Sequence, residues 1–548
     1  MITETAMGET VTETPRHEVI VLGAGVSGIY QIKRLTDLGI DAIVLEADDD
    51  LGGTWHRNRY PGARFDSESY TYGYSFSKEL LEEWHWKERF SAQPENLSYL
   101  NYVAEKFDLR RHMRFNSRVE QMTWDDAERV WHLKLQSGDT YVTRFVITSL
   151  GPLSMPTKPV YEGMDDFTGE AFHTFWWPKE PVQLEGRKVG VIGTGATGIQ
   201  VISEIADKVG ELTVFQRRPN WSTPLNNRPI SDDEMAVIRA RYDEIFANCA
   251  ASPGGFEHVA DPRRFWDVSA EERRELWDEL YKEPGFALLV SNFTDIFFDE
   301  TANAEISGYV ADRIRGRVDD PKVAEKLIPK DHGFGMQRLP LETRYFEAYN
   351  RDNVKLVDLA ETPIERFTAD GIQTTTEQHD LDVIVYATGF DAITGGYDRI
   401  DIRGVGGVTL ADKWSESPST YFGVLTNGFP NMLMVAGPQS VSGSTNFPRA
   451  IETGVDWVTD LLTHARDNGR TRIEAEQDAE DQWVERVVRA HERMLFRRSK
   501  GWFTGYNSNV AGHQEGKVRY QAYFGGAPRY AALVAEAAAD GYAGIALS

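Results

Sequence analysis

Two glycine-rich turns of equal spacing are the residues of this chain best suited to holding phosphate groups. Gly23-x-Gly25-x-x-Gly28 follows the apolar run 19–22, and Gly193-x-Gly195-x-x-Gly198 follows residues 188–192. In such a turn one glycine permits the tight bend, one lets backbone approach a pyrophosphate, and one lets the next helix pack closely on the strand. The N-terminus of that helix then faces the anion. Each turn therefore predicts a dinucleotide site at the end of a buried strand.

The residues that end the second strand of each unit predict which dinucleotide is bound. Residues 42–45 end at Glu46, where a carboxylate can accept hydrogen bonds from both ribose hydroxyls and disfavours a 2′-phosphate. This unit should hold FAD, with NAD as the alternative. Residues 212–215 end instead at Gln216, Arg217 and Arg218, and this basic pair favours the 2′-phosphate of NADPH. The simpler alternative is a solvated basic strand end.

Composition excludes several classes of partner. The 548 residues carry 85 acidic and 59 basic side chains, a net charge of -26, which would repel nucleic acid and anionic membranes. The single cysteine, Cys249, excludes an internal disulfide and a CxxC pair and fits a reducing cytoplasm. We expect no metal site, and we leave monomer and homodimer open. Residues 1–16 have no apolar core and indicate a disordered tail, and no apolar run approaches membrane-spanning length.

A third pattern lies just before the second glycine turn. Its fixed positions, in the spacing F-x-G-x-x-x-H-x-x-x-W-P, are Phe167, Gly169, His173, Trp177 and Pro178. This spacing resembles the fingerprint of the flavin-dependent Baeyer-Villiger monooxygenases of the cyclohexanone, phenylacetone and steroid types. Those enzymes use NADPH and dioxygen to insert oxygen beside a ketone carbonyl. The simpler alternative, a buried structural histidine and a core tryptophan, is disfavoured by the two flanking turns.

The resemblance extends from Gly23 to about Gly525 and implies a set of residues around FAD. Residues 52–55 and 58–66 resemble the GG-x-W and RYPGxxxD segments of the family. The resemblance places Thr54, Trp55, Asp66 and Tyr72 near FAD, the backbone of Val119 at the end of a later strand near the adenine, and Phe447 beside the flavin. Phe65 stands where the family usually has cysteine, with little expected consequence. Asp66 could alternatively be a turn residue or helix cap.

The segment 330–340 resembles the family segment that carries an arginine required for oxygen transfer, here Arg338. Its guanidinium would stabilise an anionic C4a-peroxyflavin and then the tetrahedral intermediate formed on the ketone. Asp66 would orient Arg338 through a bidentate pair. Gln337 stands where the family commonly has a lysine that grips the 2′-phosphate, and we expect Arg218 to compensate.

The remaining residues implied for NADP form the second turn and a C-terminal loop. The expected set is Gly193, Thr194, Gly195, Ala196, Thr197, Gly198, Gln200, Arg217, Arg218, Gln337, Arg338 and Trp502. Trp502 begins W-x-x-G-x-N, which in the family belongs to a mobile loop that closes over NADP. The continuation 508–516 departs from the family pattern. Residues 440–447 are expected to line the substrate cavity, and Gly443, Phe447 and Pro448 depart from the pattern of phenylacetone and steroid relatives.

These patterns predict an α/β fold with two Rossmann-like dinucleotide-binding domains, for FAD and NADP, and a helical insertion in the NADP domain. The expected boundaries are 1–16 for the tail, 17–150 and 386–548 for the FAD domain, 151–186 for a linker with the fingerprint, and 187–385 for the NADP domain with an insertion at 225–330. The expected reaction converts a cyclic or bulky ketone to an ester or lactone. The alternatives are a flavin N- or S-monooxygenase, which generally lacks the Trp-Pro ending, and a non-catalytic flavoprotein.

Overall fold

The first sheet is built around the two strands that flank the first glycine turn. The computed structural model describes residues 14–514 and 517–548, so most of the predicted tail, 1–13, lies outside the described residues. The strand order is β17 (Asp401–Arg403), β4 (Val119–Asp125), β5 (Val130–Leu135), β6 (Thr140–Thr148), β1 (Arg16–Leu22), β2 (Ala42–Leu45) and β3 (Met113–Arg114), and β18 (Met432–Met434) also pairs with β6. Arg16 already belongs to β1, so the sheet begins inside the range predicted as a tail.

The carboxyl ends of the central strands meet at one edge of this sheet. β1 is parallel to both β2 and β6, and Leu22 is opposite Leu45 on one side and Thr148 on the other. Residues 19–22 and 42–45 are all buried, as expected for strands of a parallel sheet that is covered on both faces. The edge where these strands end is therefore where the first glycine turn and Glu46 come together.

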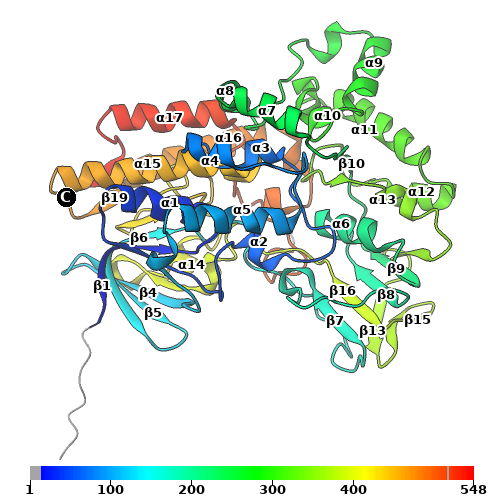
Figure 1. Ribbon diagram of the computed structural model, residues 1–548, viewed down its shortest axis with the longest axis horizontal. Helices are drawn as coiled ribbons and strands as arrows, with labels where there is room; N and C mark the ends of the chain where they lie inside the picture. The colour runs from blue at the N-terminus through cyan, green and yellow to red at the C-terminus, as the bar shows by residue number, and fades with distance from the viewer. Residues whose placement is uncertain (1–13, 515–516) are drawn as a thin grey trace, which may run out of the picture.

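The second sheet is entirely parallel and forms a separate lobe in Figure 1. Its order is β12 (Val354–Asp358), β9 (Glu211–Gln216), β8 (Lys188–Ile192), β16 (Val383–Tyr386) and β7 (Glu170–His173). β7 lies inside the range predicted as a linker, yet it pairs with β16 along its whole length. The predicted linker thus contributes an edge strand to the second sheet. The sequence did not reveal this strand, because His173 is its only buried residue and leaves no apolar pattern to read.

Helices cover the sheets and fill the predicted insertion. The first lobe contains α1 (Val26–Asp37), α5 (Gln93–Lys106), α15 (Phe447–Asp467), α16 (Gln477–Glu492) and α17 (Ala527–Ala539), and the short helices α2 (Thr54–Arg57), α3 (Ser69–Tyr72), α4 (Lys78–Glu83) and α14 (Leu410–Lys413). The second glycine turn leads into α6 (Ala196–Ile205). The insertion contains α7 (Asp232–Ala240), α8 (Tyr242–Ala251), α9 (Ala270–Leu280), α10 (Ala287–Val290), α11 (Glu300–Arg315) and α12 (Pro321–Leu327), and α13 (Tyr345–Ala348) follows it.

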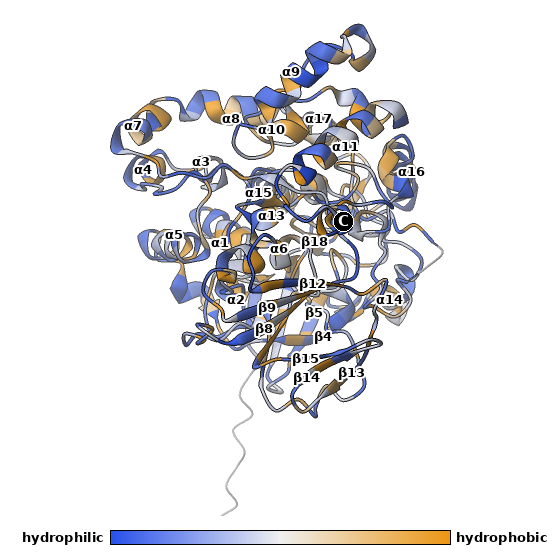
Figure 2. Cartoon of the chain, turned by 90° about the vertical axis from the view of Figure 1, so that its right-hand side faces the viewer, coloured by the Kyte–Doolittle hydropathy of each residue, from blue (hydrophilic) through white to orange (hydrophobic). Residues whose placement is uncertain are grey.

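In Figure 1, α10, α11 and α12 lie above the second sheet, with α9 at the outer end. Helices α7 and α8 instead lie beside α17 and supply buried residues such as Met235 and Ile245 to the core of the first lobe. A capping box opens α9: the side chain of Ser269 accepts from the backbone of Glu272, and the Glu272 side chain accepts from the backbone of Ser269. Figure 2 shows hydrophilic and hydrophobic residues together on these outer helices, as an amphipathic helix packed on one face requires.

Three small sheets complete the described chain. They are β13 (Ile364–Thr368), β14 (Gly371–Thr374) and β15 (Gln378–Asp380); β10 (Thr223–Pro224) with β11 (Leu341–Glu342); and β19 (Ile473–Ala475) with β20 (Ile545–Leu547). The β10–β11 pair joins the two ends of the insertion, so the segment that carries Arg338 is held beside the segment that follows β9. Within the described part of the chain, no helix combines the length and apolar character needed to span a bilayer.

Candidate functional site: two nucleotide cradles and an arginine

The first glycine turn is shaped so that only glycine fits at two of its positions. A Cβ at Gly28 would lie 1.8 Å from the carbonyl oxygen of Gly23, and Gly23 itself has a φ of +103°. Helix α1 begins without a side-chain N-cap, so its first N–H groups are available to an anion. The turn therefore fits a dinucleotide pyrophosphate.

A second glycine pair completes this cradle. The N–H of Gly52 donates to the carbonyl of Ala24 at 2.9 Å, and a Cβ on Gly53 would come within 2.9 Å of the Gly25 Cα. A side chain at Gly53 would fill the space between the two loops, and one at Gly52 would meet Leu97 and His56. The pair thus keeps backbone exposed to whatever the first turn binds.

Glu46 is buried at the end of β2 and is held by backbone donors. Its carboxylate accepts from the N–H of Ala24 at 2.6 Å and from the N–H of Asp48 at 2.8 Å. Burial raises the pKa of Glu46, and the hydrogen bond from Ala24 opposes that shift. Each carboxylate oxygen accepts more than one hydrogen bond, so the geometry still fits the ribose hydroxyls.

Three aromatic residues that follow the first glycine turn in the chain, Trp55, Phe65 and Tyr72, pack against one another. Trp55 Nε1 donates to the hydroxyl of Tyr72 at 2.9 Å, and Phe65 stacks on Tyr72 with ring centroids 4.1 Å apart. Phe65, at the position where a cysteine was expected, therefore acts as a packing surface for Tyr72. Thr54 begins α2 and is exposed, and Phe447 begins α15.

Val119 lies at the start of β4, not at the end of a strand as predicted. The prediction placed Val119 at the end of a strand, but β3 ends at Arg114 and β4 begins only at Val119, with a segment outside the sheet between them. The N–H of Ser117 in that segment donates to the carbonyl of Glu46 at 2.7 Å. Val119 is therefore still close in sequence to a residue anchored at the end of β2.

Arg338 and Asp66 meet, although 272 residues separate them. Arg338 Nη2 donates to Asp66 Oδ2 at 3.1 Å, while Nη1 donates to the carbonyl of Leu339. The pair is therefore joined by one hydrogen bond and is not bidentate as predicted, because the second nitrogen is engaged by backbone. Arg338 also lies over the ring of Phe286, 4.9 Å from its centroid.

The two side chains of this pair differ in exposure. The side chain of Asp66 is 6% exposed and that of Arg338 is 40% exposed. Burial raises the pKa of Asp66, and the charge of Arg338 opposes the shift. A buried carboxylate thus anchors a guanidinium whose other side is accessible, which is suited to stabilising negative charge on a bound molecule.

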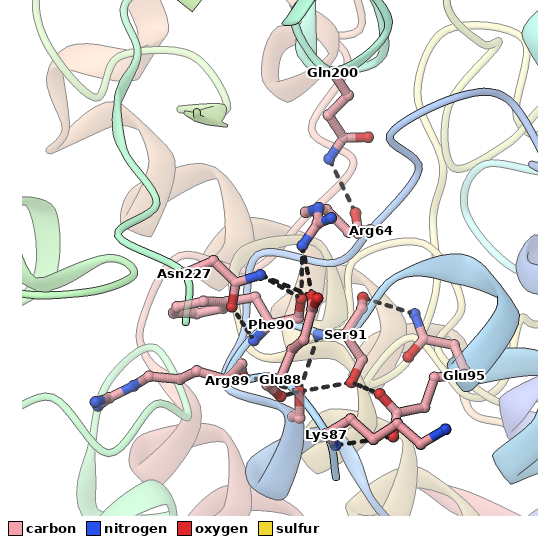
Figure 3. A network of polar contacts seen from close by, with 11 residues as sticks. Arg64, Lys87, Glu88, Arg89, Phe90, Ser91, Glu95, Gln200 and Asn227 are labelled. Atoms are coloured by element: carbon pink, nitrogen blue, oxygen red, sulfur yellow. Dashed lines mark hydrogen bonds and ion pairs between the residues drawn. The ribbon is translucent and has the colours of Figure 1, made fainter. Parts of the chain in front are cut away.

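A polar network holds the segment that leads to Asp66 (Figure 3). Arg64 Nη1 donates to Glu88 Oε2 and to the carbonyl of Phe90, both at 3.0 Å. Asn227, at the start of the insertion, donates to the same Glu88 oxygen at 2.9 Å. Asp66 is therefore positioned by contacts with both the first lobe and the insertion.

Gln200 also enters this network, from α6. Its Nε2 donates to the carbonyl of Arg64 at 3.0 Å, and its Oε1 accepts from the hydroxyl of Tyr60 at 2.8 Å. Both ends of the amide therefore join the second lobe to the first. Its predicted contact with NADP stays a prediction.

The second glycine turn repeats the geometry of the first. A Cβ at Gly198 would lie 2.1 Å from the Gly193 carbonyl, while nothing lies within 4 Å of a Cβ built at Gly195. Ala196 and Thr197 form the first turn of α6, which has no side-chain N-cap. Thr194 is buried, and its hydroxyl donates to the carbonyl of Arg218 at 3.0 Å. Open space in front of Gly195 fits a second dinucleotide.

The basic pair after β9 is covered by the C-terminal loop. Arg217 donates to the Ser508 hydroxyl. Arg218 Nη2 donates to the carbonyl of Lys500 at 2.9 Å, and its Nη1 pairs with Asp331 at 3.1 Å. The Nε2 of Gln337 donates to the same Lys500 carbonyl at 3.1 Å. The structure thus brings Arg217, Arg218 and Gln337 together, as predicted, with Lys500 and Ser508 in addition.

Trp502 lies between this basic group and the expected substrate segment. A Cβ at Gly443 would be 3.8 Å from the Trp502 ring. Asn507 Nδ2 donates to the carbonyl of Phe390 at 2.8 Å, and Asn509 Nδ2 donates to that of Thr388 at 3.1 Å. The loop is therefore docked on the segment where the chain returns from the second sheet to the first.

The fingerprint residues lie at the seam between the lobes. The Nδ1 of His173 accepts from the N–H of Phe175 at 3.1 Å, and its Nε2 lies 3.2 Å from the carbonyl of Thr157. Trp177 is buried in the core of the second lobe, and Pro178 follows it. A Cβ at Gly169 would lie 2.5 Å from the Asp382 carbonyl and 2.5 Å from the Phe167 ring.

Several residues of the site escaped the sequence analysis. Tyr60, Phe286 and Lys500 are described above, and Asn220 Nδ2 donates to the carbonyl of Arg338 at 3.2 Å. Lys500 lies two residues before Trp502, the first residue of the W-x-x-G-x-N segment, and this proximity was the available signal. The positions of Phe286 and Asn220 depend on how the insertion packs, and the sequence carries no local sign of that.

Comparison with known proteins identifies the family. Residues 16–248 match the model of the flavin-binding monooxygenase-like family. A 2-oxo-Δ3-4,5,5-trimethylcyclopentenylacetyl-CoA monooxygenase of Pseudomonas putida is 43% identical over 98% of this chain and 99% of that protein. A Baeyer-Villiger monooxygenase of Pseudooceanicola batsensis is 39% identical over 93% and 92%. The chain belongs to the Baeyer-Villiger monooxygenases.

A solved structure agrees with this assignment. OTEMO in complex with FAD and NADP superposes with a TM-score of 0.94 at 42% identity, covering 98% of this chain and 100% of that one. The fold class, the enzyme class and the two cofactors predicted from the sequence are thereby confirmed. The family also includes a different chemistry close by, because a phenazine N-monooxygenase of Lysobacter antibioticus is 36% identical over 97% of both chains.

Proposed function

We propose that Arg338 acts at the reacting atoms when this monooxygenase converts a ketone, dioxygen, NADPH and a proton into an ester or lactone, NADP+ and water. The observation that carries the proposal is the hydrogen bond between Arg338 and the buried Asp66. Bound FAD supplies the electron transfer from NADPH to dioxygen. The guanidinium stabilises the negative oxygen that forms when the ketone carbonyl is attacked, and it does not give up its proton.

We assign the cofactors to the two cradles. FAD is held by Gly23, Gly25, Gly28 and Glu46, with Thr54, Trp55, Asp66, Tyr72, Val119 and Phe447 beside it. NADP is held by residues 193–198, Gln200, Arg217, Arg218, Gln337, Arg338 and Trp502. The uncapped starts of α1 and α6 support the phosphate contacts. We also propose that the fingerprint segment acts at the seam between the two lobes. Its resemblance to the family fingerprint supports this role, and it comprises Phe167, Gly169, His173, Trp177 and Pro178.

For the substrate, we propose a cyclic or bulky ketone bound beside residues 440–447. The name of the Pseudomonas putida relative describes a cyclic substrate, and we place Trp502 over the same side of the site as residues 440–447. The alternative is N-oxygenation, which the name of the Lysobacter antibioticus relative favours. The two are separated by measuring whether ketones or aromatic amines accelerate NADPH oxidation and yield oxygenated product.

The remaining expectations concern the setting of the enzyme. We propose that it acts in the cytoplasm, because its single cysteine, Cys249, is free and suits a reducing compartment. The net charge of -26 supports the absence of nucleic-acid and membrane partners. Monomer and homodimer remain alternatives.

The test of the proposal is Arg338→Ala. We expect the variant to oxidise NADPH and reduce its flavin, but to release hydrogen peroxide and form about 10²–10³-fold less ester, the scale of a lost anion-stabilising donor. Arg489→Ala is the control, because Arg489 is exposed on α16 and pairs only with Glu485 within that helix. Undiminished ester yield from Arg338→Ala would disprove the assigned role.

A further inference from the structure

Arg57, the last residue of α2, joins the segment that follows β2 to the segment that follows the fingerprint histidine. Its Nε and Nη2 both donate to the carboxylate of Asp48, and its guanidinium carbon lies 5.7 Å from the centroid of the Phe175 ring. That distance is within the range of a cation–π contact. Phe175 belongs to a short 3₁₀ helix, Thr174–Trp176, which follows directly on β7. One side chain therefore contacts both lobes.

Each end of this contact leads to another part of the site. The main-chain N–H of Asp48 donates to Glu46 Oε1 at 2.8 Å, so Arg57 is held beside the carboxylate that we assign to the FAD ribose. On the other side, the Phe175 ring meets the ring of Phe390 edge-on, with centroids 5.7 Å apart. Phe390 lies in the return connection from the second sheet to the first. Arg57 thus links the first cradle to that connection.

Burial distinguishes this contact from a second one close by. The side chain of Asp48 is 9% exposed and that of Arg57 is 29% exposed, and a bidentate arginine–carboxylate pair fixes the direction of the guanidinium plane. The second contact is the ion pair of Lys179 with Asp49, in which both side chains are more than half exposed. Solvated pairs of this kind contribute little. The contact through Arg57 is therefore the better fixed of the two.

We propose that Arg57 is a positioning residue for the transfer of hydride from NADPH to FAD. In this step NADPH gives a proton and two electrons to FAD, yielding NADP+ and FADH−. The inference rests on the proposed assignment of FAD to the first cradle and NADPH to the second. Donor and acceptor are then held by different lobes, and the rate of transfer depends on their relative placement. Arg57 supports that placement because it fixes Phe175 against the first cradle.

The main experiment measures anaerobic flavin reduction by NADPH in a stopped-flow instrument. Arg57→Ala should lower the limiting rate about tenfold, the scale of a partly desolvated cation–π contact, while the dissociation constant of NADP+ stays within about twofold of wild type. Enzyme reduced with dithionite should react with dioxygen at the wild-type rate, because that step needs no hydride donor. Arg57→Lys should recover most of the loss, because it keeps a cation near the ring. Lys179→Ala is the matched control and should be reduced at the wild-type rate.

A double-mutant cycle with Phe175→Leu tests whether the two residues act together. Phe175→Leu keeps an apolar side chain against Phe390 and should slow reduction as Arg57→Ala does, and the double variant should be no slower than either. Hydrogen exchange gives a readout that is independent of turnover. The amides of residues 173–179 should exchange about tenfold faster in Arg57→Ala than in wild type or Lys179→Ala, because the segment opens locally.

Three results would overturn the proposal: reduction of Arg57→Ala at the wild-type rate, effects of Arg57→Ala and Phe175→Leu that multiply in the double variant, or equal slowing of reduction and reoxidation. Phe175→Leu leaves the Asp48 pair intact, so it tests the contact even where Arg57→Ala fails to retain FAD. An error in the cofactor assignment would look different, because Glu46→Ala would then retain FAD as tightly as wild type and Arg217→Ala would bind NADP+ unchanged.

Discussion

At the scale of single residues, the arrangement of Arg338 depends on what its two terminal nitrogens contact. One is used by the Leu339 carbonyl and the other by Asp66. Asp66 is therefore a positioning residue whose single hydrogen bond sets where the guanidinium points. Because the carboxylate is buried, its removal also leaves the nearby cation uncompensated.

This predicts a graded series at position 66. Asp66→Asn keeps an acceptor for Arg338 but loses the charge, and should lower ester formation about tenfold. Asp66→Ala loses both and should lower it about 100-fold, as expected for charge-assisted hydrogen bonds in partly buried sites. The measurement is ester formed and hydrogen peroxide released per NADPH consumed.

Asp37→Asn is the control for this series, because Asp37 is exposed on α1 and pairs with Lys33. Equal activity of the asparagine and alanine variants would contradict a role for the hydrogen bond to Arg338. Full activity of both would remove Asp66 from the site.

At the scale of elements, the loop after Trp502 is docked by asparagine side chains. Asn507 holds the carbonyl of Phe390 through its amide nitrogen, and its amide oxygen accepts from the N–H of Asn509 at 2.9 Å. The docking surface is the return segment 387–391, which runs from β16 to the first sheet. Closure of the loop is thus linked to the connection between the lobes.

We predict that Asn507→Ala loosens this closure. Loss of the docking hydrogen bond, worth about 1 kcal/mol, should shift the loop roughly fivefold toward the open state. Hydrogen peroxide released per NADPH should rise several-fold, while the rate of flavin reduction stays within twofold. Stopped-flow absorbance and a peroxide assay measure the two quantities.

Gln514→Ala serves as the comparison, since Gln514 is exposed in the same loop and accepts from the N–H of Gly512. If Asn507→Ala and Gln514→Ala release the same amount of peroxide as wild type, docking through Asn507 does not shelter the reaction.

At the scale of the whole molecule, the two lobes are joined at His173. Nδ1 accepts a hydrogen bond from Phe175, so Nε2 carries the proton and donates to the Thr157 carbonyl. The N–H of Thr157 in turn donates to the carbonyl of Gly389, in the return connection, at 2.9 Å. A second proton on the ring would face the N–H of Phe175. The contact between His173 and Phe175 therefore depends on a neutral imidazole.

The free energy of unfolding should depend on pH, because His173 is neutral in the folded enzyme. Burial lowers the pKa of His173 from 6.5 to about 4, so between those values the unfolded chain takes up the proton first. The free energy of unfolding should therefore fall as pH decreases below 6.5, by about 1.4 kcal/mol at pH 5.5 and about 3 kcal/mol below pH 4 from this residue.

His173→Gln should remove this part of the pH dependence. The measurement is urea unfolding at pH 7.5 and 5.5, with the difference between the two pH values compared between variant and wild type. His132→Gln, in an exposed part of β5, should behave as wild type. An unchanged difference in His173→Gln would show that folding does not shift the pKa of this ring.

The sequence by itself determined the local units of this enzyme. The glycine turns, the buried strands beside them, Glu46 and the Arg217–Arg218 pair follow from short-range patterns, because strand burial, tight turns and helix starts depend on residues close together in the chain. The fingerprint and the arginine segment added the family by resemblance. The edge strand β7 was missed because its exposed residues carry no such pattern.

Only the tertiary structure decided which distant side chains meet. It joined Arg338 to Asp66 by one hydrogen bond, turned Gln200 toward Tyr60 and Arg64, and placed Lys500 beside Arg218, 282 residues away in the chain. These contacts depend on how the insertion and the C-terminal loop pack between two lobes. That packing is set by many weak interactions between remote segments, and no short stretch of sequence contains them.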